Sequence, residues 1–177
     1  PYAARLLERL AAADATVGVS ASNAGIEVLA TELYGDASLP RDEVLTRLVE
    51  PLGADVTVYD PVDWKAPYAS GSARVDAYVV CPCSMATVGT LASGAMSNLI
   101  HRAASVALKE RRRLVVMPRE TPLSLIHLEN MATLTRAGAI VMPAMPGFYN
   151  HPRSVDQLVD FMVAKALDHL GVPHDLM

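Results

Sequence analysis

The residues best suited to chemistry stand directly after apolar segments of the chain. Ser84 and Thr87 follow the run VDAYVVCPC, and Arg119 and Glu120 follow LVVMP. A hydroxyl residue at a helix start, together with the free backbone N–H groups there, can hold a phosphate. An arginine and a glutamate at the end of a buried strand need a ligand or one another, because unpaired buried charges are costly. The spacing therefore indicates a pocket rim, with simple capping by Ser84 and an ion pair between Arg119 and Glu120 as alternatives.

Three other residues are candidates for the same rim. Ser22 stands at a strand-to-helix junction, where an N-cap is its ordinary role. Tyr149 follows the last predicted strand. Trp64, the sole tryptophan, stands in a loop rich in Pro, Gly and Ser. Its π face could stabilise positive charge, although a loop anchor packed on the surface explains it equally well.

Other polar residues have ordinary explanations when taken alone. Lys109 opens the run KERRR, which is typical of a solvated helix end, and Glu32 in LATEL is typical of an exposed helix position. Cys81 and Cys83 are one residue apart, where strain opposes a disulfide, so we expect structural thiols in a reducing, cytoplasmic compartment. The five histidines show no spacing typical of a metal site.

Helices alternate with short apolar strands along the chain. The pattern predicts helices at 2–13, 23–34, 41–50, 85–92, 98–110, 123–137 and 154–170, and strands at 15–20, 54–60, 75–80, 114–117 and 139–143. This alternation predicts an α/β fold in which right-handed crossovers connect the strands of a parallel sheet. Ligands of such sheets bind at the carboxyl ends of the strands, where the polar residues stand.

Composition excludes several classes of protein. The length of 177 residues favours one domain, residues 1–177. A net charge of −4 with few aromatic residues argues against nucleic-acid binding, and no apolar run is long enough for a membrane helix. Hydrophobic residues make up 51% of the chain, which burial between subunits of a homo-oligomer would explain.

Several segments resemble the UbiX-type flavin prenyltransferases in order and spacing. They are the stretch from CPCSMATVGTLASGAMSNLIHRAA through LKERRRLVVMPRETPLSLIHLENM, the loop DWKAPYASGS, ATEL, PGFYNHP and VDFMVAKAL. Agreement over so many separate segments is more specific than any single motif. The resemblance implies a Rossmann-like or flavodoxin-like three-layer fold that binds FMN.

The resemblance also assigns roles to residues. FMN contacts are implied for Ser22, Ser84, Met85, Ala86, Thr87 and Arg119. Catalytic roles are implied for Glu32, Glu120 and Trp64, and binding of the substrate phosphate for Lys109, Tyr149 and Lys165. Some relatives have arginine where Lys165 stands, which replaces a bidentate fork with a point charge.

The implied reaction joins dimethylallyl phosphate to N5 and C6 of reduced FMN. Phosphate leaves, no metal takes part, and the prenylated FMN serves a UbiD-type decarboxylase. Family members form dodecamers in which neighbouring subunits complete the site. They also open with a strand that ends in Gly-Ala-Ser-Gly, which is absent from the sequence here, so we expect further residues ahead of Pro1.

Two other functions remain open at this point. The FMN-dependent cysteine decarboxylases share the fold, but their catalytic histidine and Pro-Ala-Ser-Ala-Asn motif are not found here. A flavin storage module would bind FMN and release it unchanged. The mass of the flavin released after incubation with both substrates separates these possibilities.

Overall fold

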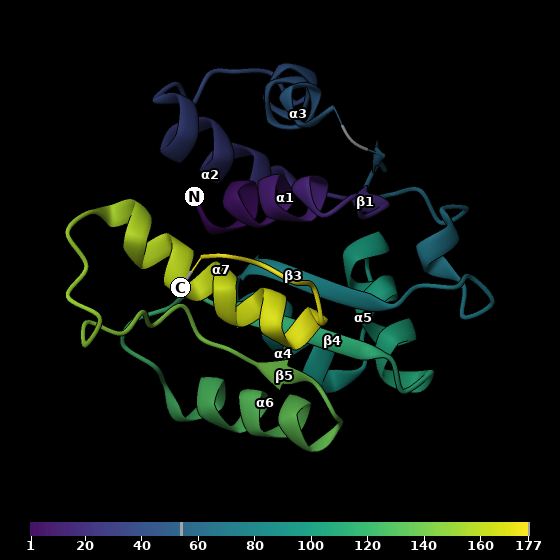
Figure 1. Cartoon of the computed structure of the whole chain (residues 1–177). Coiled ribbons are helices and arrows are strands. Elements are labelled where there is room, and N and C mark those ends of the chain that lie inside the picture. Colours follow the sequence, from purple (N-terminus) through teal and green to yellow (C-terminus); the bar gives the residue numbers. More distant parts are fainter. Residues whose placement is uncertain (54, 177) are drawn as a thin grey trace. The chain divides into compact units, whose positions relative to one another are not determined.

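The structure, a computed structural model, describes residues 1–53 and 55–176, which belong to two units of the chain. The first unit comprises Pro1–Pro61 and Pro146–Met177, and the second comprises Val62–Met145. Figure 1 labels the α-helices of both units and the strands β1, β3, β4 and β5.

The first unit combines four α-helices with a pair of parallel strands among its described residues. Its elements are α1 (Tyr2–Ala12), β1 (Val17–Val19), α2 (Asn23–Tyr34), α3 (Arg41–Val49), the short 3-10 helix η1 (Glu50–Leu52), β2 (Val56–Val58) and α7 (Val155–Leu170). β1 pairs with β2, beginning with Val17 opposite Val56. Helices α1 and α7 are far apart in the sequence but are joined by a salt bridge of 2.6 Å between Arg5 and Asp160.

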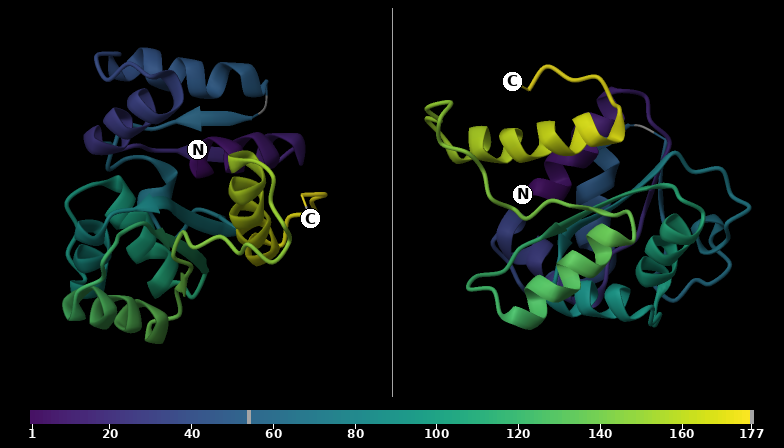
Figure 2. Two further views of the ribbon diagram at one scale, coloured as in Figure 1. Left: turned by 90° about the vertical axis from the view of Figure 1, so that its left-hand side faces the viewer. Right: turned by 90° about the horizontal axis from the view of Figure 1, so that it is seen from below.

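The second unit is a three-stranded parallel sheet with helical connections. Its elements are η2 (Pro67–Ala69), β3 (Ala77–Cys83), α4 (Met85–Ser93), α5 (Leu99–Lys109), β4 (Arg113–Pro118), α6 (Leu125–Arg136) and β5 (Ile140–Val141). The strand order is β3-β4-β5, so β4 is central. Figure 2 gives two further views of the ribbon in which the strands and helices of this unit can be followed.

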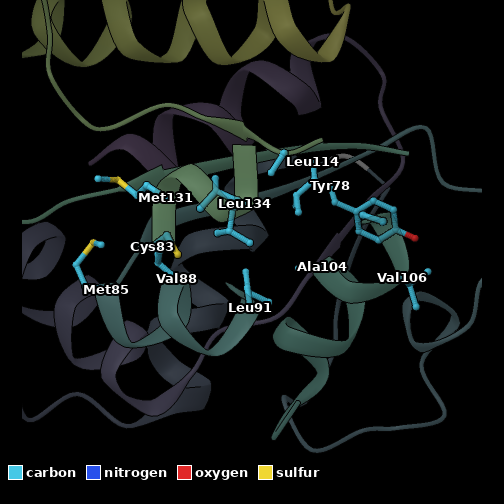
Figure 3. Close-up of a cluster of buried hydrophobic side chains, with 13 residues drawn as sticks. Tyr78, Cys83, Met85, Val88, Leu91, Ala104, Val106, Leu114, Met131 and Leu134 are labelled. Carbon is cyan, nitrogen blue, oxygen red and sulfur yellow. The ribbon is translucent and has the colours of Figure 1, made fainter. Parts of the chain in front are cut away.

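The core of the second unit explains why its strands read as continuous apolar runs. Leu114 and Val116 of β4 are 0% exposed and pack with side chains from α4, α5 and α6. Val115 and Met117 point to the other face of the strand and are at most 1% exposed. Figure 3 shows Met85, Val88 and Leu91 from α4 within the same cluster. A strand covered on both faces needs apolar residues at every position, which is the pattern of a buried parallel strand.

Helix boundaries follow local capping chemistry and agree with the prediction. The Ser22 hydroxyl accepts a hydrogen bond of 3.1 Å from the Gly25 N–H, which caps α2. Gly35 ends that helix with φ of 67°, a left-handed conformation that glycine adopts at low cost. Ser154 and Gly171 cap and end α7 in the same way.

Strand boundaries differ from the prediction. β3 continues through Cys83, three residues beyond the predicted end at 80, because its ladder with β4 resumes after a bulge and pairs Cys83 with Pro118. The predicted strand at 54–60 begins at Ala54, which lies outside the described residues. The strands also form two parallel sheets, one in each unit, where the alternation predicted a single sheet. No helix in the described residues is both long and apolar enough to cross a bilayer.

Candidate active site

The carboxyl ends of β3 and β4 bring two predicted site segments together. Cys83 lies opposite Pro118, and the Arg119 N–H donates a hydrogen bond of 3.3 Å to the Cys83 carbonyl. Ser84 and Arg119 therefore leave the sheet from neighbouring backbone positions although 34 residues separate them. This edge of the second unit is where a parallel sheet places its ligands.

Ser84 caps α4 and keeps its hydroxyl close to a second one. Its Oγ accepts a hydrogen bond of 3.2 Å from the Thr87 N–H and lies 3.2 Å from the Thr87 hydroxyl. Ala86 is exposed at this helix start, whereas Met85 is only 8% exposed because its side chain packs into the core (Figure 3). Met85 can thus contribute its backbone N–H to a ligand, but not its side chain.

Arg119 and Glu120 are both exposed at the end of β4. The Glu120 carboxylate accepts a hydrogen bond of 3.0 Å from the Thr121 N–H. Within the described part of the chain, no salt bridge joins Glu120 to Arg119, so the alternative of a strand-end ion pair is wrong for the single chain. Exposure also removes the desolvation cost that burial of these charges would impose. Both side chains are free to meet a ligand.

A phosphate-bearing flavin suits the donors at this edge. The first turn of α4 presents backbone N–H groups and the hydroxyls of Ser84 and Thr87, and Arg119 adds a guanidinium group. Helix starts and arginine forks are the ordinary protein ligands of phosphate. These residues could therefore hold the phosphate of FMN.

The loop that carries Trp64 comes close to Lys109 in the second unit. Trp64 is 50% exposed on the loop that leads into η2, and η2 packs against α5. At the end of α5, Lys109 pairs with Glu110, and its Nζ lies 2.9 Å from the position that a Cβ atom would take at Gly71. The loop that carries Trp64 and the predicted phosphate ligand Lys109 thus meet within the second unit.

Two arginines that the sequence did not identify hold this loop. Arg102 Nε donates a hydrogen bond of 2.8 Å to the Ala69 carbonyl. Arg112 donates one of 2.6 Å to the Gly71 carbonyl and one of 3.3 Å to the Tyr78 hydroxyl. Arg112 belongs to the run interpreted as a solvated helix end, and nothing in its sequence context distinguishes it from its exposed neighbours.

Lys109 lies at the amino end of β4, and Arg119 lies at its carboxyl end. Lys109 ends α5 before β4 begins at Arg113, whereas Arg119 directly follows the end of β4. Five residue steps along a strand span about 17 Å. Lys109 and Arg119 of one chain are therefore separated by the length of β4.

A depression lies at the end of this sheet where the parallel strands begin, and it is not the predicted site. It has a volume of about 580 Å³, and its lining residues are Asp76, Arg111, Arg112, Arg113, Gly138 and Ile140. None of these residues was assigned to the flavin or the substrate. The hollow lies at the end of the sheet away from Ser84 and Arg119.

In the first unit, Ser22 and Glu32 lie at different levels of α2. Ser22 caps the helix, and Glu32 follows ten residues later, which corresponds to about 15 Å along a helix axis. The Glu32 carboxylate lies 3.7 Å from the Pro1 nitrogen and is 43% exposed. The exposure agrees with the ordinary explanation of Glu32 as a solvated helix residue.

Tyr149 and Lys165 are linked in the first unit through α7. The Tyr149 ring meets the Phe161 ring edge to face, with centroids 5.8 Å apart. Lys165 stands one helical turn after Phe161, and its Nζ lies 3.6 Å from the Asp168 carboxylate. A phenol and an ammonium group are both suitable donors to a phosphate.

The two cysteines differ in burial: Cys83 is buried, and Cys81 is partly exposed. Both thiols are free. Cys83 is 1% exposed, and this burial raises the pKa of its thiol to about 12. Because a thiol must ionise to act as a nucleophile, a raised pKa argues against a nucleophilic role for Cys83.

Comparison with known proteins assigns the family. The flavoprotein family model matches residues 1–167. A flavin prenyltransferase UbiX of Pseudomonas aeruginosa is 47% identical over an alignment that covers 99% of this chain and 86% of that protein. The chain belongs to the UbiX flavin prenyltransferase family.

Solved structures of UbiX proteins agree with this fold. A dodecameric FMN-dependent UbiX-like decarboxylase from Escherichia coli matches with a TM-score of 0.86 and 39% identity, over 98% of this chain and 90% of that one. A UbiX protein in complex with FMN and dimethylallyl pyrophosphate matches with a TM-score of 0.84 and 37% identity, over 97% and 85% of the two chains. The α/β architecture expected from the alternation of strands and helices is therefore that of the UbiX family.

Proposed function

We propose that this protein transfers the dimethylallyl group of dimethylallyl phosphate to reduced FMN and releases inorganic phosphate. The observation that carries the proposal is the 47% identity to a flavin prenyltransferase across 99% of the chain. A UbiX structure that contains FMN together with dimethylallyl pyrophosphate supports FMN and a dimethylallyl donor as the two substrates. The family match runs through both units, which supports the treatment of residues 1–177 as one FMN-binding domain.

The proposed reaction needs no oxidant, because its atoms balance between the two substrates. The bond between the allylic carbon and the phosphate oxygen breaks, and that carbon bonds to N5 of the reduced flavin, which loses a proton. A second bond from the prenyl group to C6 closes a fourth ring. There the alkene gains a proton, and C6 loses one. The product, prenylated FMN, is proposed to serve a UbiD-type decarboxylase.

In this proposal the exposed groups at the carboxyl ends of β3 and β4 bind FMN. Ser84, Thr87 and Arg119 hold its phosphate, with backbone N–H groups of Met85 and Ala86 and with Ser22 as further contacts. Glu120 transfers protons near the reacting flavin nitrogen or the departing phosphate. Glu32 lines the reaction cavity, and the Trp64 ring stabilises positive charge on the allyl group.

Lys109, Tyr149 and Lys165 neutralise the departing phosphate in this proposal. Cationic donors and a phenol can stabilise a leaving phosphate without a metal ion. Since β4 separates Lys109 from Arg119, a complete site takes these two residues from different subunits. The dodecamer of the Escherichia coli relative supports a homo-oligomer of the same kind here. The free thiols support a cytoplasmic location.

The mass of the flavin product tests the proposal. The full-length protein is incubated without oxygen with reduced FMN and dimethylallyl phosphate, and the released flavin is analysed by mass spectrometry. We expect a flavin that is heavier by one isoprene unit, together with free phosphate. A folded, FMN-loaded protein that returns only unmodified FMN would be a storage module. A parallel reaction with dimethylallyl pyrophosphate identifies the donor. Prenylated flavin that forms from the pyrophosphate but not from the monophosphate contradicts the choice of the monophosphate.

A further inference from the structure

We propose that Phe161 and Gly147 are positioning residues that hold the phenol of Tyr149 beside Lys165 and thereby set the affinity for the phosphate-bearing substrate. The inference rests on the proposed function, in which Tyr149 and Lys165 bind that phosphate. It adds two residues that touch neither substrate and act through the Tyr149 ring. All four residues belong to the first unit.

The backbone of Gly147 packs closely against the Tyr149 ring. A Cβ atom at Gly147 would lie 2.6 Å from Cε1 and 3.0 Å from Cδ1 of Tyr149. The same atom would lie 3.2 Å from Cζ of Phe161. Atoms do not pack at the shorter of these separations, so a side chain here would displace the ring. The absence of a side chain is what lets the ring rest on the backbone.

The Phe161 ring is the second group that packs against Tyr149. Its ring stands at 83° to the Tyr149 ring with 5.8 Å between centroids, which is the favoured edge-to-face arrangement of an aromatic pair. Tyr149 itself is 70% exposed. Because so little else covers the tyrosine, the Gly147 backbone and the Phe161 ring decide the direction in which its hydroxyl points.

Helix α7 connects this arrangement to the ammonium group. Phe161 and Lys165 are four residues apart on α7, so their side chains leave the same side of the helix one turn apart. The Lys165 Nζ lies 3.6 Å from the carboxylate of Asp168, which stands three residues further along α7. A ring fixed by Phe161 therefore presents its phenol near the turn that carries Lys165. A phenol and a cation that are held in advance bind an allylic phosphate with less loss of conformational entropy.

Steady-state kinetics of single variants test the first half of the inference. In Phe161→Leu we expect the KM for dimethylallyl phosphate to rise about 2- to 10-fold, the range that loss of one aromatic pair corresponds to. The affinity for FMN, followed by flavin fluorescence, should stay unchanged. Gly147→Ala, which lies outside the helix, should act in the same direction. Phe148→Leu removes the neighbouring ring, which is 69% exposed, and should leave the KM unchanged.

A double-mutant comparison tests whether Phe161 acts through Tyr149. In a Tyr149→Leu background, Phe161→Leu should produce no further rise in the KM. An equal rise in both backgrounds, an unchanged KM in the single variant, or the same rise in Phe148→Leu would each overturn the positioning role. Those outcomes leave prenyl transfer by the wild-type protein intact. Absence of prenylated flavin from the wild-type protein instead rejects the proposed function, and the positioning role with it.

Discussion

Lys109 and Arg119 stand at opposite ends of β4. Lys109 ends α5 four residues before the strand begins, and Arg119 follows the last residue of the strand. The intervening β4 spans about 17 Å, so the two residues stand at opposite ends of the strand within one chain. We expect each active site to combine Lys109 of one subunit with Arg119 of another.

Mixed oligomers test this arrangement. Lys109→Ala and Arg119→Ala should each abolish most prenyl transfer, whereas an oligomer assembled from both variants should regain roughly a quarter of the wild-type activity, because one site in four then combines two intact residues. Differently tagged variants are co-expressed, purified through both tags and assayed. As a control, the separately purified variants are mixed without reassembly. Activity that stays at the level of the single variants would place both residues in sites formed by one chain.

Glu120→Gln should slow prenyl transfer without loss of FMN binding. The exposed carboxylate of Glu120 follows the Arg119 segment at the ligand edge, where it can move a proton, and the amide that replaces it cannot. General acid–base groups contribute about 100-fold or more to rates, so single-turnover prenylation should fall by that order. Flavin fluorescence measures binding. Glu27→Gln, an exposed carboxylate of α2, is the matched control. Equal transfer rates in wild type and Glu120→Gln would remove Glu120 from the mechanism.

Lys165→Ala should chiefly weaken binding of the phosphate substrate. A charge-assisted contact to phosphate is worth about 1.5–3 kcal/mol, so the KM should rise by about 10-fold or more while FMN affinity is retained. Lys165→Arg should restore most of the affinity because the charge is kept. Arg136→Ala removes an exposed cation at the end of α6 and serves as the control. An unchanged KM in Lys165→Ala would assign the phosphate to other donors.

Arg112→Ala should loosen the loop that carries Trp64. The variant leaves the Gly71 carbonyl and the Tyr78 hydroxyl without their guanidinium donor. A hydrogen bond from a charged group contributes about 1.5–3 kcal/mol, so the free energy of unfolding should fall by an amount of that order. Trp64 is the sole tryptophan, and its emission should shift to longer wavelength as the loop opens. Arg113→Ala, on the exposed neighbour, should change neither quantity, and equal effects in both variants would contradict a specific role for Arg112.

The Cys83 thiol should resist alkylation in the folded protein. The same thiol should make the folded protein less stable at high pH. Burial raises the thiol pKa from 9.0 to about 12, so the folded state holds the proton that the unfolded chain loses above pH 9. The stability associated with this thiol is therefore complete below pH 9 and is lost as pH rises toward 12. Iodoacetamide labelling at pH 8 with and without denaturant, read by peptide mass, measures the protection. The same pH series on Cys83→Ala should lack this part of the decline. Rapid labelling of native Cys83 would contradict its burial.

Local chemistry was sufficient for the helices and for the order of the elements. Ser22 and Gly35 bound α2 as predicted, because capping and left-handed glycine act within a few residues. Continuous apolar runs likewise identified the buried strands. Strand ends were less certain, since β3 continues to Cys83 only because β4 offers a hydrogen-bonding partner there. Such a partner is distant in sequence, so no local pattern contains it.

The sequence by itself determined the α/β class, the helix caps and the family, because capping and apolar periodicity are local and the family motifs are written in the residue order. Only the tertiary structure decided which residues meet. It turned the Met85 side chain into the core, placed Lys109 at the opposite edge of the sheet from Arg119, and brought Arg112 onto the Gly71 carbonyl. Each of these outcomes depends on the direction of a strand or on the approach of a distant segment, and residue type carries neither.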